Sequence, residues 1–479
     1  MKLSFLAKEL EGARITKDAE FFSLCTDSRV SENGDLFFCF EGSKCDSHAF
    51  AAEAERRGAS AVVCERELPV SLPQLVVADG REAMALISAI FYSHPEKGMK
   101  FVGITGTNGK TTTAFLVRSI LEHAGKKAGL IGTLGAYYGE KEVAPDLTTP
   151  DPVALFSLLA DMRRDGVDVV VMEVSAHALA LKKVKPILFD VAIFTNLTQD
   201  HLDFFGDMER YFAAKKELFT SAQCKFAVLN SDDPHCSALA KSGIPHVSYG
   251  LETPADAFAI VESETVRGSR LLLNLNDDLA ETTLRLTGRH NVYNALAAAV
   301  AARRLGAKLN DIAEGIAAVK SVSGRLEWVA SYHGADIFVD FAHTPDGLQK
   351  SLAALRAHAE GRLICLFGCG GNRDKTKRPL MGKTAAKGCD FAVITSDNPR
   401  YEDPCEIIAQ IEEGYRAYSD KYVLVEEREK ATEYALNSLK EGDILLVAGK
   451  GGETYQEIMG IKYDYDDKNI IKSLLGTLS

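Results

Sequence analysis

The sequence predicts an α/β protein of three domains, in which short apolar strands alternate with helical segments along most of the chain. The chain has 479 residues. A single hydrophobic core stops growing at about 250 to 300 residues, so the chain is long enough for more than one domain. The alternation is interrupted by the proline, glycine and charged residues of Ser93–Gly98, which resemble a linker, and it restarts near Gly324. We therefore expect domains at residues 1–97, 98–323 and 324–479.

Composition places the chain among ordinary globular proteins, with 46% hydrophobic and 25% charged residues. Its net charge of −12 argues against a nonspecific binder of nucleic acid or of anionic membranes, so phosphate chemistry would need local positive sites. No apolar run approaches the about 18 residues of a membrane helix, the N-terminus does not resemble a signal sequence, and the ten cysteines form no CxxC pair. We expect a cytoplasmic monomer with reduced cysteines that acts on small molecules, with no nucleic-acid or membrane partner.

The first domain is expected to alternate strands with helices. The expected strands are Asp35–Phe40, Ala59–Cys64 and Gln74–Val77, and the expected helices are Ala49–Arg57 and Arg81–Tyr92. A polar cluster, Thr26-Asp27-Ser28-Arg29, follows the apolar run Phe21–Cys25. It could hold a polar ligand through hydroxyl and backbone contacts, or it could be only a turn.

An apolar strand, a glycine-rich turn and a helix follow one another from Phe101 to Phe115, and this order predicts a phosphate-binding loop. Gly106 and Gly109 allow a tight turn with inward N–H groups, and Lys110 supplies a mobile positive charge. A threonine after the lysine can offer a hydroxyl to magnesium, and the helix dipole favours an anion. The general loop pattern has glycine where this chain has Ile104, so the loop is a shorter form. The alternative is a plain turn with an incidental lysine.

Polar residues follow the next expected strands, Asp168–Val174 and Asp190–Thr195, and ligands in parallel sheets collect beyond such strand ends. Glu173 ends the first strand, and His201 lies in the polar run after the second. A buried carboxylate needs a cation or donors, and Mg²⁺ suits a site beside a phosphate loop because it takes few protein ligands. The alternative is that both residues are hydrogen-bonded at helix starts.

Two helical segments later in this domain carry polar residues. Periodicity places Lys215, in the segment Tyr211–Glu217, on the surface. Asn291 and Asn294 lie on one face of a helix that continues through Ala295–Arg304. They could bind a base by paired hydrogen bonds, or they could be a cap and a surface residue.

The last domain again alternates strands with helices. Its expected strands are Asp336–Phe341, Arg362–Phe367, Asp390–Thr395, Lys421–Val425 and Asp443–Val447. The glycine-rich run after Phe367 resembles a dinucleotide fingerprint but has Arg373 at the last glycine, so we reject nicotinamide binding. Arginine binds carboxylates and acidic groups bind ammonium, so the strand ends around Asp397 and Glu453 could form an amino-acid pocket. Taken singly, these residues are strand-end turns.

The ordered set of motifs resembles the Mur ligases of peptidoglycan synthesis over the whole length. The motifs are TDSR, GTNGKTTT, EVSAH, TNLTQDHLD, YFAAK, GRHNVYN, GRLE, DFAHTPD, GGNRDKTKRP, DNPR and AGKGGE. The resemblance implies a UDP-substrate domain, a central ATP-binding domain with a mostly parallel sheet and helices on both faces, and a Rossmann-like amino-acid domain. It implies an ATP-dependent ligase that adds meso-2,6-diaminopimelate to the D-Glu γ-carboxylate of UDP-MurNAc-L-Ala-D-Glu through an acyl phosphate, with Mg²⁺ as cofactor.

The resemblance also assigns roles to single residues. The implied catalytic residues are Lys110, Glu173, His201, carbamylated Lys215 and His343. The implied ATP-binding residues are Gly106, Thr107, Asn108, Gly109, Lys110, Thr111, Thr112, Asn291, Asn294, Arg325 and Asp340, and the implied magnesium ligands are Thr111, Glu173, His201 and Lys215. The implied contacts to the UDP-MurNAc dipeptide are Thr26, Ser28, the loop after Gly42, Thr148, Thr149, Ser175 and Lys183. The implied diaminopimelate pocket comprises Arg373, Asp397, Asn398, Arg400, Gly449 and Glu453.

Only the resemblance reverses the surface interpretation of Lys215. A lysine, with a reference pKa of about 10.4, must lose its proton before it reacts with CO₂, and the carbamate is then an anion that can hold a metal ion.

Three positions depart from the family pattern. Gly452 replaces a histidine, and Phe341 replaces a tyrosine. Lys183 replaces an arginine, and a lysine cannot bind a carboxylate or phosphate in the bidentate way that an arginine can. Arg400 favours diaminopimelate over L-lysine because it can pair with a distal carboxylate that lysine lacks. The alternatives are an L-lysine-adding Mur ligase, a relative of folylpolyglutamate synthase, and an ATP-binding regulatory module without ligase activity.

Overall fold

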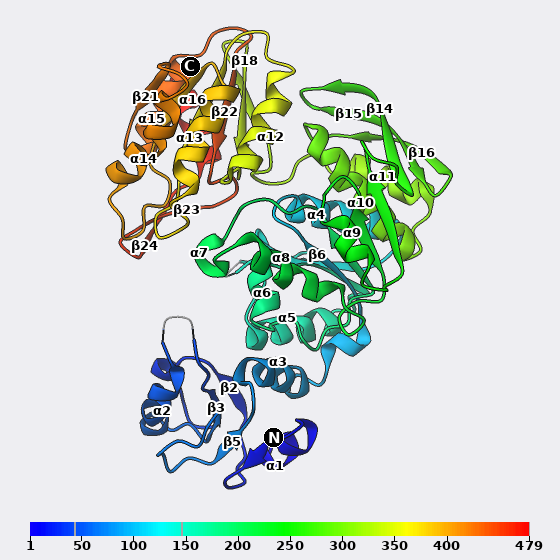
Figure 1. The fold of residues 1–479 in the computed structure, drawn as a ribbon, viewed down its shortest axis with the longest axis vertical. Coiled ribbons are helices and arrows are strands. Elements are labelled where there is room, and N and C mark those ends of the chain that lie inside the picture. The colour runs from blue at the N-terminus through cyan, green and yellow to red at the C-terminus, as the bar shows by residue number, and fades with distance from the viewer. Residues whose placement is uncertain (43–44, 145–146, 479) are drawn as a thin grey trace. The chain divides into compact units, whose positions relative to one another are not determined.

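The protein is described here by a computed structural model that covers residues 1–42, 45–144 and 147–478 (Figure 1). The chain divides into two compact units. The first comprises Met1–Gly103, Lys127–Asp190 and Thr220–Lys225, and the second comprises Ile104–Lys126, Val191–Phe219 and Phe226–Ser479. The three expected domains and their two boundaries stay a prediction.

The first unit contains a five-stranded sheet in the order β1-β5-β4-β3-β2. Its strands are β1 (Arg14–Ile15), β2 (Ser23–Cys25), β3 (Asp35–Phe38), β4 (Ala61–Cys64) and β5 (Gln74–Val76). All neighbours pair in parallel except β1, which runs antiparallel to β5. The expected strands of this part of the chain are confirmed.

Helices cover both faces of this sheet. Successive residues of a strand point to opposite faces, so neighbouring side chains pack in different core clusters. Phe38 packs in one core cluster with residues of α1 (Leu3–Glu9) and α3 (Gly80–Phe91). Phe37 packs in a second cluster with residues of α2 (Ala51–Arg57). Short 3₁₀ helices complete this part: η1 (Ser28–Val30), η2 (Ser47–Phe50) and η3 (Pro95–Gly98).

The segment expected to be a linker is packed rather than open. Pro95 and Glu96, at the start of η3, are buried. Arg163 donates through Nη1 to the carbonyl oxygen of His94 at 3.1 Å. A proline fits the first position of a helical turn, so the same composition that predicts a linker also suits a short helix.

The rest of the first unit contains strands that are neighbours in the order β10-β7-β8-β9. They are β10 (Val169–Glu173), β7 (Ala128–Gly132), β8 (Gly135–Tyr138) and β9 (Lys141–Val143). β10 and β7 are parallel, and β7, β8 and β9 form an antiparallel meander that the sequence did not predict. All three residues of β9 are exposed, so its sequence has no alternation of apolar and polar residues that would predict a strand. The helices are α5 (Pro152–Arg164), which packs against α3, and α6 (Ala176–Ala180).

In the second unit, six strands are neighbours in the order β16-β15-β14-β13-β12-β11. They are β11 (Val191–Phe194), β12 (Ala227–Asn230), β13 (His246–Gly250), β14 (Ala257–Thr265), β15 (Gly268–Leu275) and β16 (Asp278–Leu284). The expected parallel pairing is confirmed from β11 to β14, and an unpredicted antiparallel meander follows from β14 to β16.

Strand β6 (Lys100–Thr105) leads into the second unit and is followed by helix α4 (Lys110–His123). Helix α4 packs against α10 (Arg289–Arg304) and α11 (Leu309–Ala318). The remaining helices of this part are α7 (Leu202–Phe205), α8 (Met208–Lys216), η4 (Glu217–Phe219) and α9 (Cys236–Ala240). The expected strand, turn and helix around the glycine-rich loop are therefore present.

A six-stranded sheet in the order β17-β18-β22-β19-β20-β21 also belongs to the second unit. Its strands are β17 (Glu327–Tyr332), β18 (Ala335–Asp340), β19 (Leu363–Phe367), β20 (Phe391–Ile394), β21 (Tyr422–Leu424) and β22 (Ile444–Ala448). All neighbours are parallel except β17 and β18. A separate hairpin consists of β23 (Tyr455–Ile458) and β24 (Ile461–Asp464).

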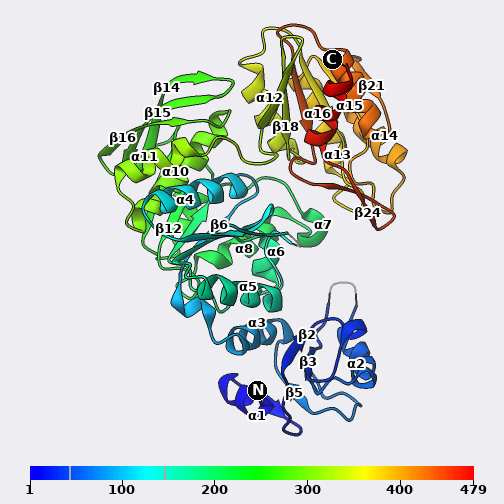
Figure 2. The same cartoon turned by 180° about the vertical axis from the view of Figure 1, so that it is seen from behind.

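Helices lie on both faces of this sheet (Figure 2). Cys365 packs with residues of α12 (Pro345–Arg356), α13 (Lys377–Gly388) and α14 (Pro404–Arg416). Ile364, which points to the other face, packs with residues of α15 (Arg428–Asn437) and α16 (Asp467–Leu478). The predicted α/β class is therefore confirmed. Among the described residues, no helix is long and apolar enough to cross a membrane.

A buried ion pair ties α15 and α16 to the ends of this sheet. Arg428 and Asp467 are both shielded from solvent, and Arg428 Nη2 lies 2.8 Å from Asp467 Oδ2. Arg428 also donates to the carbonyl oxygens of Ala448, at 2.9 Å, and Ser396, at 3.4 Å. The charge of Asp467 raises the pKa of Arg428 in spite of burial. Removing one partner would leave a buried charge without compensation.

We predict that Asp467→Asn destabilises this sheet by about 3–5 kcal/mol, the usual cost of breaking a buried pair. Urea unfolding followed by the fluorescence of Trp328, the only tryptophan and a residue of β17, measures the loss. Glu427→Gln is the control, since Glu427 pairs with Lys430 on the surface. Equal unfolding midpoints for the two variants would contradict the role given to the buried pair.

Candidate active site

The loop between β6 and α4 has a backbone that only glycine fits. Gly109, the cap of α4, has φ +87°, and a Cβ there would lie 2.5 Å from Asn294 Oδ1. Gly106 has φ +148°, and a Cβ there would collide with Thr195 Oγ1. The predicted tight turn is present, and the positive end of the α4 dipole faces this loop.

Asn196, just after β11, holds the loop from the side. Its carbonyl oxygen accepts from the N–H of Thr107 at 2.9 Å, and its Oδ1 accepts from the N–H of Asn108 at 2.9 Å. Its Nδ2 donates back to the carbonyl oxygen of Asn108 at 3.2 Å. Thr195 Oγ1 adds a bond to that oxygen at 2.6 Å. The strand end thus fixes the loop's shape.

Two lysines share one oxygen of the loop. Lys110 Nζ donates to the carbonyl oxygens of Gly106 and Thr107, each at 2.9 Å. Lys215 Nζ donates to the same Gly106 oxygen at 2.9 Å. Lys215 is 1% exposed, so the surface position expected from periodicity is wrong. The buried face of α8 is Tyr211, Ala214 and Lys215, and the helical spacing from Tyr211 carries the lysine inward.

The setting of Lys215 favours a neutral amine. Burial, and then the charge of Lys110, hold the pKa of Lys215 well below its ordinary value. Asp200 works weakly in the opposite direction. The amine also lies 4.4 Å from the ring centre of Tyr211, whose own pKa burial raises. An unprotonated amine is the nucleophilic form of lysine.

Asp200 lies among three basic side chains. Its Oδ2 is 3.4 Å from His201 Nε2 and 3.6 Å from His343 Nε2, and its Oδ1 is 3.9 Å from Lys377 Nζ. Burial disfavours the ionised carboxylate, but His343, then His201 and Lys377, outweigh it and hold the pKa of Asp200 well below its usual value. Asp200 lies within the run TNLTQDHLD, from which no role for it was predicted.

Residues after position 323 contact the loop directly. Arg325 Nη2 donates to Thr111 Oγ1 at 2.9 Å, and its guanidinium lies 4.5 Å from the ring centre of Phe341. Asn108 Nδ2 donates to Asp346 Oδ2 at 2.8 Å. The glycine-rich loop and the segments that flank β17 and β18 therefore contribute side chains to one site.

The predicted asparagine pair lies beside α4. Asn294 Nδ2 donates to Asn291 Oδ1 at 2.9 Å, and Asn291 Nδ2 donates to the carbonyl oxygen of Thr287 at 2.8 Å. Thr113 Oγ1 donates to Asn294 Oδ1 at 3.2 Å. Both asparagines are buried, so they fix the face of α4 behind the loop.

Asp340 stands at the end of β18 and is also buried. Its Oδ1 accepts from the N–H groups of Leu326 at 3.0 Å and Phe341 at 2.9 Å, and Ser351 donates to its Oδ2. It therefore anchors the backbone around Arg325.

The first unit gathers a second group of predicted residues. Glu173, at the end of β10, is buried and accepts from the N–H of Thr133 at 2.9 Å and from its hydroxyl at 3.1 Å. That hydroxyl lies 3.1 Å from Thr148 Oγ1. Thr149 Oγ1 donates to the carbonyl oxygen of Glu173 at 2.9 Å and accepts from the N–H of Ser175 at 3.1 Å. Sequence reasoning missed Thr133, which has no motif of its own.

Lys183 joins this group through two contacts. Its Nζ lies 2.7 Å from Asp151 Oδ1 and donates to the carbonyl oxygen of Thr149 at 3.3 Å. In η1, Ser28 Oγ donates to Glu53 Oε2 at 3.0 Å, and Thr26, just after β2, is exposed. Part of the expected loop after Gly42, residues 43–44, lies outside the described residues.

The predicted amino-acid residues gather at the ends of β20 and β22. Asn398 Nδ2 donates to Glu453 Oε2 at 2.8 Å. Asp397 is buried, and a Cβ on Gly449, which has φ +115°, would lie 2.5 Å from Asp397 Oδ2. Lys450, which sequence reasoning left without a role, donates to Asn398 Oδ1 at 2.9 Å.

Arg400 lies at the rim of this group. Its Nε lies 3.0 Å from Glu457 Oε2, and its Nη1 donates to the carbonyl oxygen of Gly371 at 2.9 Å. A Cβ on Gly370 would lie 2.9 Å from Arg400 Nη1 and 3.8 Å from Cγ of the exposed Arg373. Both predicted arginines therefore flank the same glycine.

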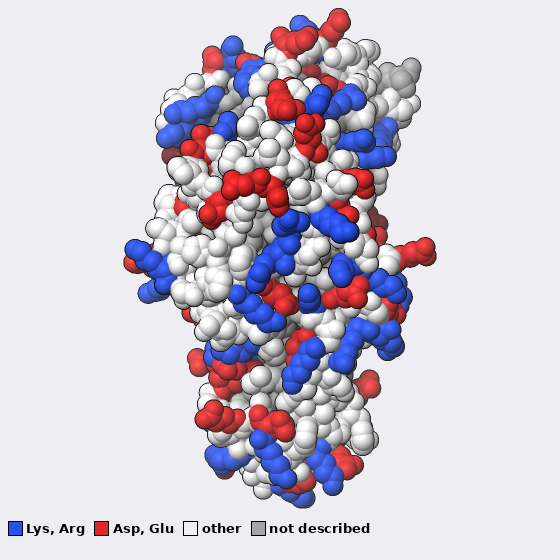
Figure 3. Space-filling view, turned by 90° about the vertical axis from the view of Figure 1, so that its right-hand side faces the viewer, with Lys and Arg blue, Asp and Glu red and all other residues white. Residues whose placement is uncertain are grey.

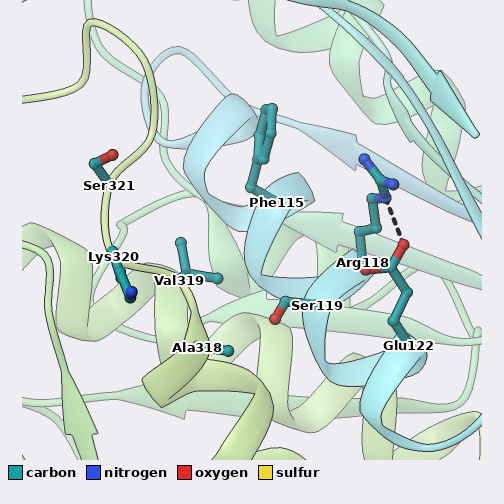
Figure 4. A pocket seen from close by; sticks show the side chains of 8 residues that line it. All are labelled: Phe115, Arg118, Ser119, Glu122, Ala318, Val319, Lys320 and Ser321. Atoms are coloured by element: carbon teal, nitrogen blue, oxygen red, sulfur yellow. Dashed lines mark hydrogen bonds and ion pairs between the residues drawn. The ribbon is translucent and has the colours of Figure 1, made fainter. Parts of the chain in front are cut away.

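Charge and shape outside these groups are less informative. Basic and acidic side chains are interspersed over the face in Figure 3, so positive charge is not gathered there in one large patch. A hollow of about 350 Å³ lies between α4 and residues 318–321, with Phe115, Val319 and the Arg118–Glu122 ion pair in its wall (Figure 4). None of the predicted site residues lines it.

Comparisons with known proteins place this geometry in a family. Two family descriptions match: Mur ligase middle domain over residues 104–302, and Mur ligase, glutamate ligase domain over residues 324–451. The chain is 42% identical to the UDP-N-acetylmuramoyl-L-alanyl-D-glutamate–2,6-diaminopimelate ligase 1 of Clostridium acetobutylicum, over 100% of both chains. The chain belongs to the Mur ligase family.

Solved structures agree on the fold. A UDP-N-acetylmuramoyl-L-alanyl-D-glutamate–2,6-diaminopimelate ligase is similar with a TM-score of 0.68 and 30% identity, over 96% of this chain and 95% of that one. The MurF ligase of Thermotoga maritima in complex with ADP is similar with a TM-score of 0.66 and 21% identity, over 95% and 98% of the two chains. The second likeness concerns the fold alone.

We predict that Gly109→Ala lowers nucleotide affinity at least about tenfold, because both the left-handed backbone and Asn294 oppose the new methyl group. Gly125→Ala is the matched control at the other end of α4, since Gly125 also has a positive φ but has open space around it. Calorimetric titration with ATP compares the two. Similar affinities for both variants would mean that the shape of this loop does not govern nucleotide binding.

Proposed function

We propose that the protein joins 2,6-diaminopimelate to the D-Glu γ-carboxylate of UDP-N-acetylmuramoyl-L-alanyl-D-glutamate in an ATP-dependent reaction, a step in the synthesis of peptidoglycan precursors. The observation that carries this proposal is the 42% identity, over both full lengths, to a relative named for that ligation. The glycine-rich loop and the polar group around Asn398 supply a nucleotide site and an amino-acid site that such a reaction needs.

The reaction would have two steps. The D-Glu γ-carboxylate attacks the γ-phosphorus of ATP, and ADP leaves as an acyl phosphate forms. The amine of diaminopimelate then attacks the acyl carbon, phosphate leaves, and the nitrogen loses a proton as the amide forms. Lys110 would neutralise the charge that develops on the phosphates, together with N–H groups at the start of α4. Those phosphates would be surrounded by the rest of the loop and the start of α4, namely Gly106, Thr107, Asn108, Gly109, Thr111 and Thr112.

The donor set suits magnesium. The Thr111 hydroxyl and the Glu173 carboxylate are hard oxygen donors, and Mg²⁺ takes its other oxygens from water and phosphate. In the part of the chain that the structure describes, no three His, Cys, Asp or Glu side chains gather as metal ligands. When bound, Mg²⁺ would withdraw charge from the γ-phosphate. We assign Thr111, Glu173 and His201 as magnesium ligands.

Lys215 would act as a carbamate. A free amine would be a poor magnesium ligand, whereas a carbamate presents two oxygens and keeps one N–H for the Gly106 carbonyl oxygen. The depressed pKa of the buried Lys215 supports this proposal, because only the unprotonated amine combines with CO₂.

Residues beyond position 290 would complete the nucleotide site. Asn291, Asn294, Arg325 and Asp340 are proposed nucleotide contacts, and His343 is a proposed catalytic residue. The contact of Arg325 with Thr111 and the position of His343 beside Asp200 support these roles.

The other substrates would occupy the two remaining groups. Thr26, Ser28, Thr148, Thr149, Ser175 and Lys183 are the proposed contacts to the UDP-MurNAc dipeptide. Arg373, Asp397, Asn398, Arg400, Gly449 and Glu453 are the proposed diaminopimelate contacts. Arg400 would pair with the distal carboxylate, since a guanidinium has five N–H donors and two are used by Glu457 and Gly371.

We further propose that the protein acts in the cytoplasm as a monomer on the meso isomer, with domains at 1–97, 98–323 and 324–479 and no nucleic-acid or membrane partner. The ten cysteines are free in the structure, which suits a reducing compartment.

Phosphate release tests the function directly. With ATP, Mg²⁺ and the UDP-MurNAc dipeptide, diaminopimelate should release phosphate at least about tenfold more efficiently than L-lysine, because only the former offers Arg400 a distal carboxylate. Preference for lysine would leave the L-lysine-adding ligase. No phosphate with any amino acid would leave the regulatory module.

A further inference from the structure

Lys450 is a fully buried lysine in the group of residues assigned to the incoming amino acid. Its Nζ donates to Asn398 Oδ1 at 2.9 Å and lies 3.4 Å from Glu453 Oε2 and 3.9 Å from Asp397 Oδ1. The glycines on either side have φ +115° and +55°, and this backbone turns the lysine between β22 and the Asp397 loop. A buried lysine is costly without partners, so these contacts hold it.

The hydrogen bonds of Lys450 fix the orientation of the Asn398 amide. Asn398 Oδ1 accepts from Lys450 and from the N–H of Glu457 at 2.9 Å. Both partners are donors, so the oxygen must point toward them. The Nδ2 group therefore points to Glu453 Oε2, to which it donates at 2.8 Å. Glu453 Oε2 is thereby held by both Asn398 and Lys450, and we assign Oε1 as the oxygen that faces a ligand.

Lys450 also sets the charge balance of the group. Asp397 and Glu453 are two carboxylates with one internal ammonium between them, because Arg428 is matched by Asp467 and Arg400 by Glu457. Burial opposes ionisation of Asp397, but Lys450 and Arg428 hold its pKa low. Burial and then the charge of Asp397 raise the pKa of Glu453. The positive charge of Lys450 therefore balances the negative charge of one of these two carboxylates, and the other carboxylate has no balancing charge in this group.

We propose that Lys450 is a positioning residue that determines amino-acid specificity: it neutralises Asp397 and orients Asn398, so that Glu453 alone receives the distal ammonium of the substrate. This rests on the proposed function. Glu453 carries the uncompensated charge, and Arg400 keeps three of its five N–H donors beyond the two used by Glu457 and Gly371, so the group matches a substrate end that carries one ammonium and one carboxylate. Without the ammonium of Lys450 it would carry two uncompensated acids and would better suit the purely cationic end of L-lysine.

The test compares Lys450→Met with Lys450→Arg and Lys462→Met. The methionine keeps much of the length and removes the charge, whereas the arginine keeps the charge. Lys462 is the control, because its Nζ lies 4.3 Å from the centre of the Tyr455 ring, which is also 5.7 Å from Lys450 Nζ, and because it is exposed. Steady-state kinetics with diaminopimelate, L-lysine and ATP gives kcat and KM for each variant.

We expect Lys450→Met to lower kcat/KM for diaminopimelate at least about tenfold, mainly through KM, with the KM for ATP nearly unchanged. The loss with L-lysine should be smaller, so the ratio of the two efficiencies falls at least about tenfold. Lys450→Arg should keep part of the preference, and Lys462→Met all of it. An unchanged ratio in Lys450→Met would overturn the proposal.

A double variant separates charge from misfolding. In Lys450→Met with Asp397→Asn, the number of uncompensated acids returns to one, so the preference for diaminopimelate should partly recover. A double variant with no recovery would overturn the charge argument. Failure of the proposed function is distinguishable, because it would appear as a wild-type protein that ligates no amino acid or prefers L-lysine.

Discussion

Two lysine side chains on one carbonyl oxygen are the constraint on which the site depends. Lys110 and Lys215 both donate to the carbonyl oxygen of Gly106, and like charges this close, with one of them buried, cannot both be retained cheaply. Lys215 is the buried one, and burial together with the charge of Lys110 holds its pKa well below the ordinary value. In the proposed reaction, Lys110 supplies the charge that meets a phosphate, and Lys215, behind the loop, is the amine that is modified.

The rest of the second unit is arranged around this loop. Asn196 holds the loop from the end of β11. Asn108 is hydrogen-bonded to Asp346, and Thr111 is hydrogen-bonded to Arg325. The same last sheet carries the amino-acid group at its strand ends. Arg325 precedes β17 and Asp346 lies in α12, and β18, which lies between them in the chain, pairs with β22, whose end carries Gly449. A ligase needs this coupling, since its amine must reach an acyl phosphate made at the nucleotide site.

Much of this could be predicted from the sequence, and the failures have physical causes. Apolar runs predicted the buried strands, and glycine spacing predicted the loop, because both depend on local properties of the chain. Lys215 could not be placed by periodicity, since a polar residue on the inner face of α8 is stabilised by a loop more than a hundred residues away. Asp200 and Lys450 were overlooked for the same reason: their partners come from distant strand ends. The strands β14 to β16 were missed because exposed polar residues interrupt their apolar positions, whereas the strands that were predicted are nearly unbroken apolar runs.

The state of Lys215 tests the account most directly. Protein equilibrated with ¹³C-labelled bicarbonate should show a carbamate carbon resonance by NMR. That resonance should be absent from Lys215→Met and retained in Lys216→Met, whose lysine is the exposed neighbour. Partial recovery of Lys215→Ala activity by a small carboxylic acid would accompany it. A wild-type protein without the resonance, or one that keeps it after Lys215 is replaced, would contradict the account.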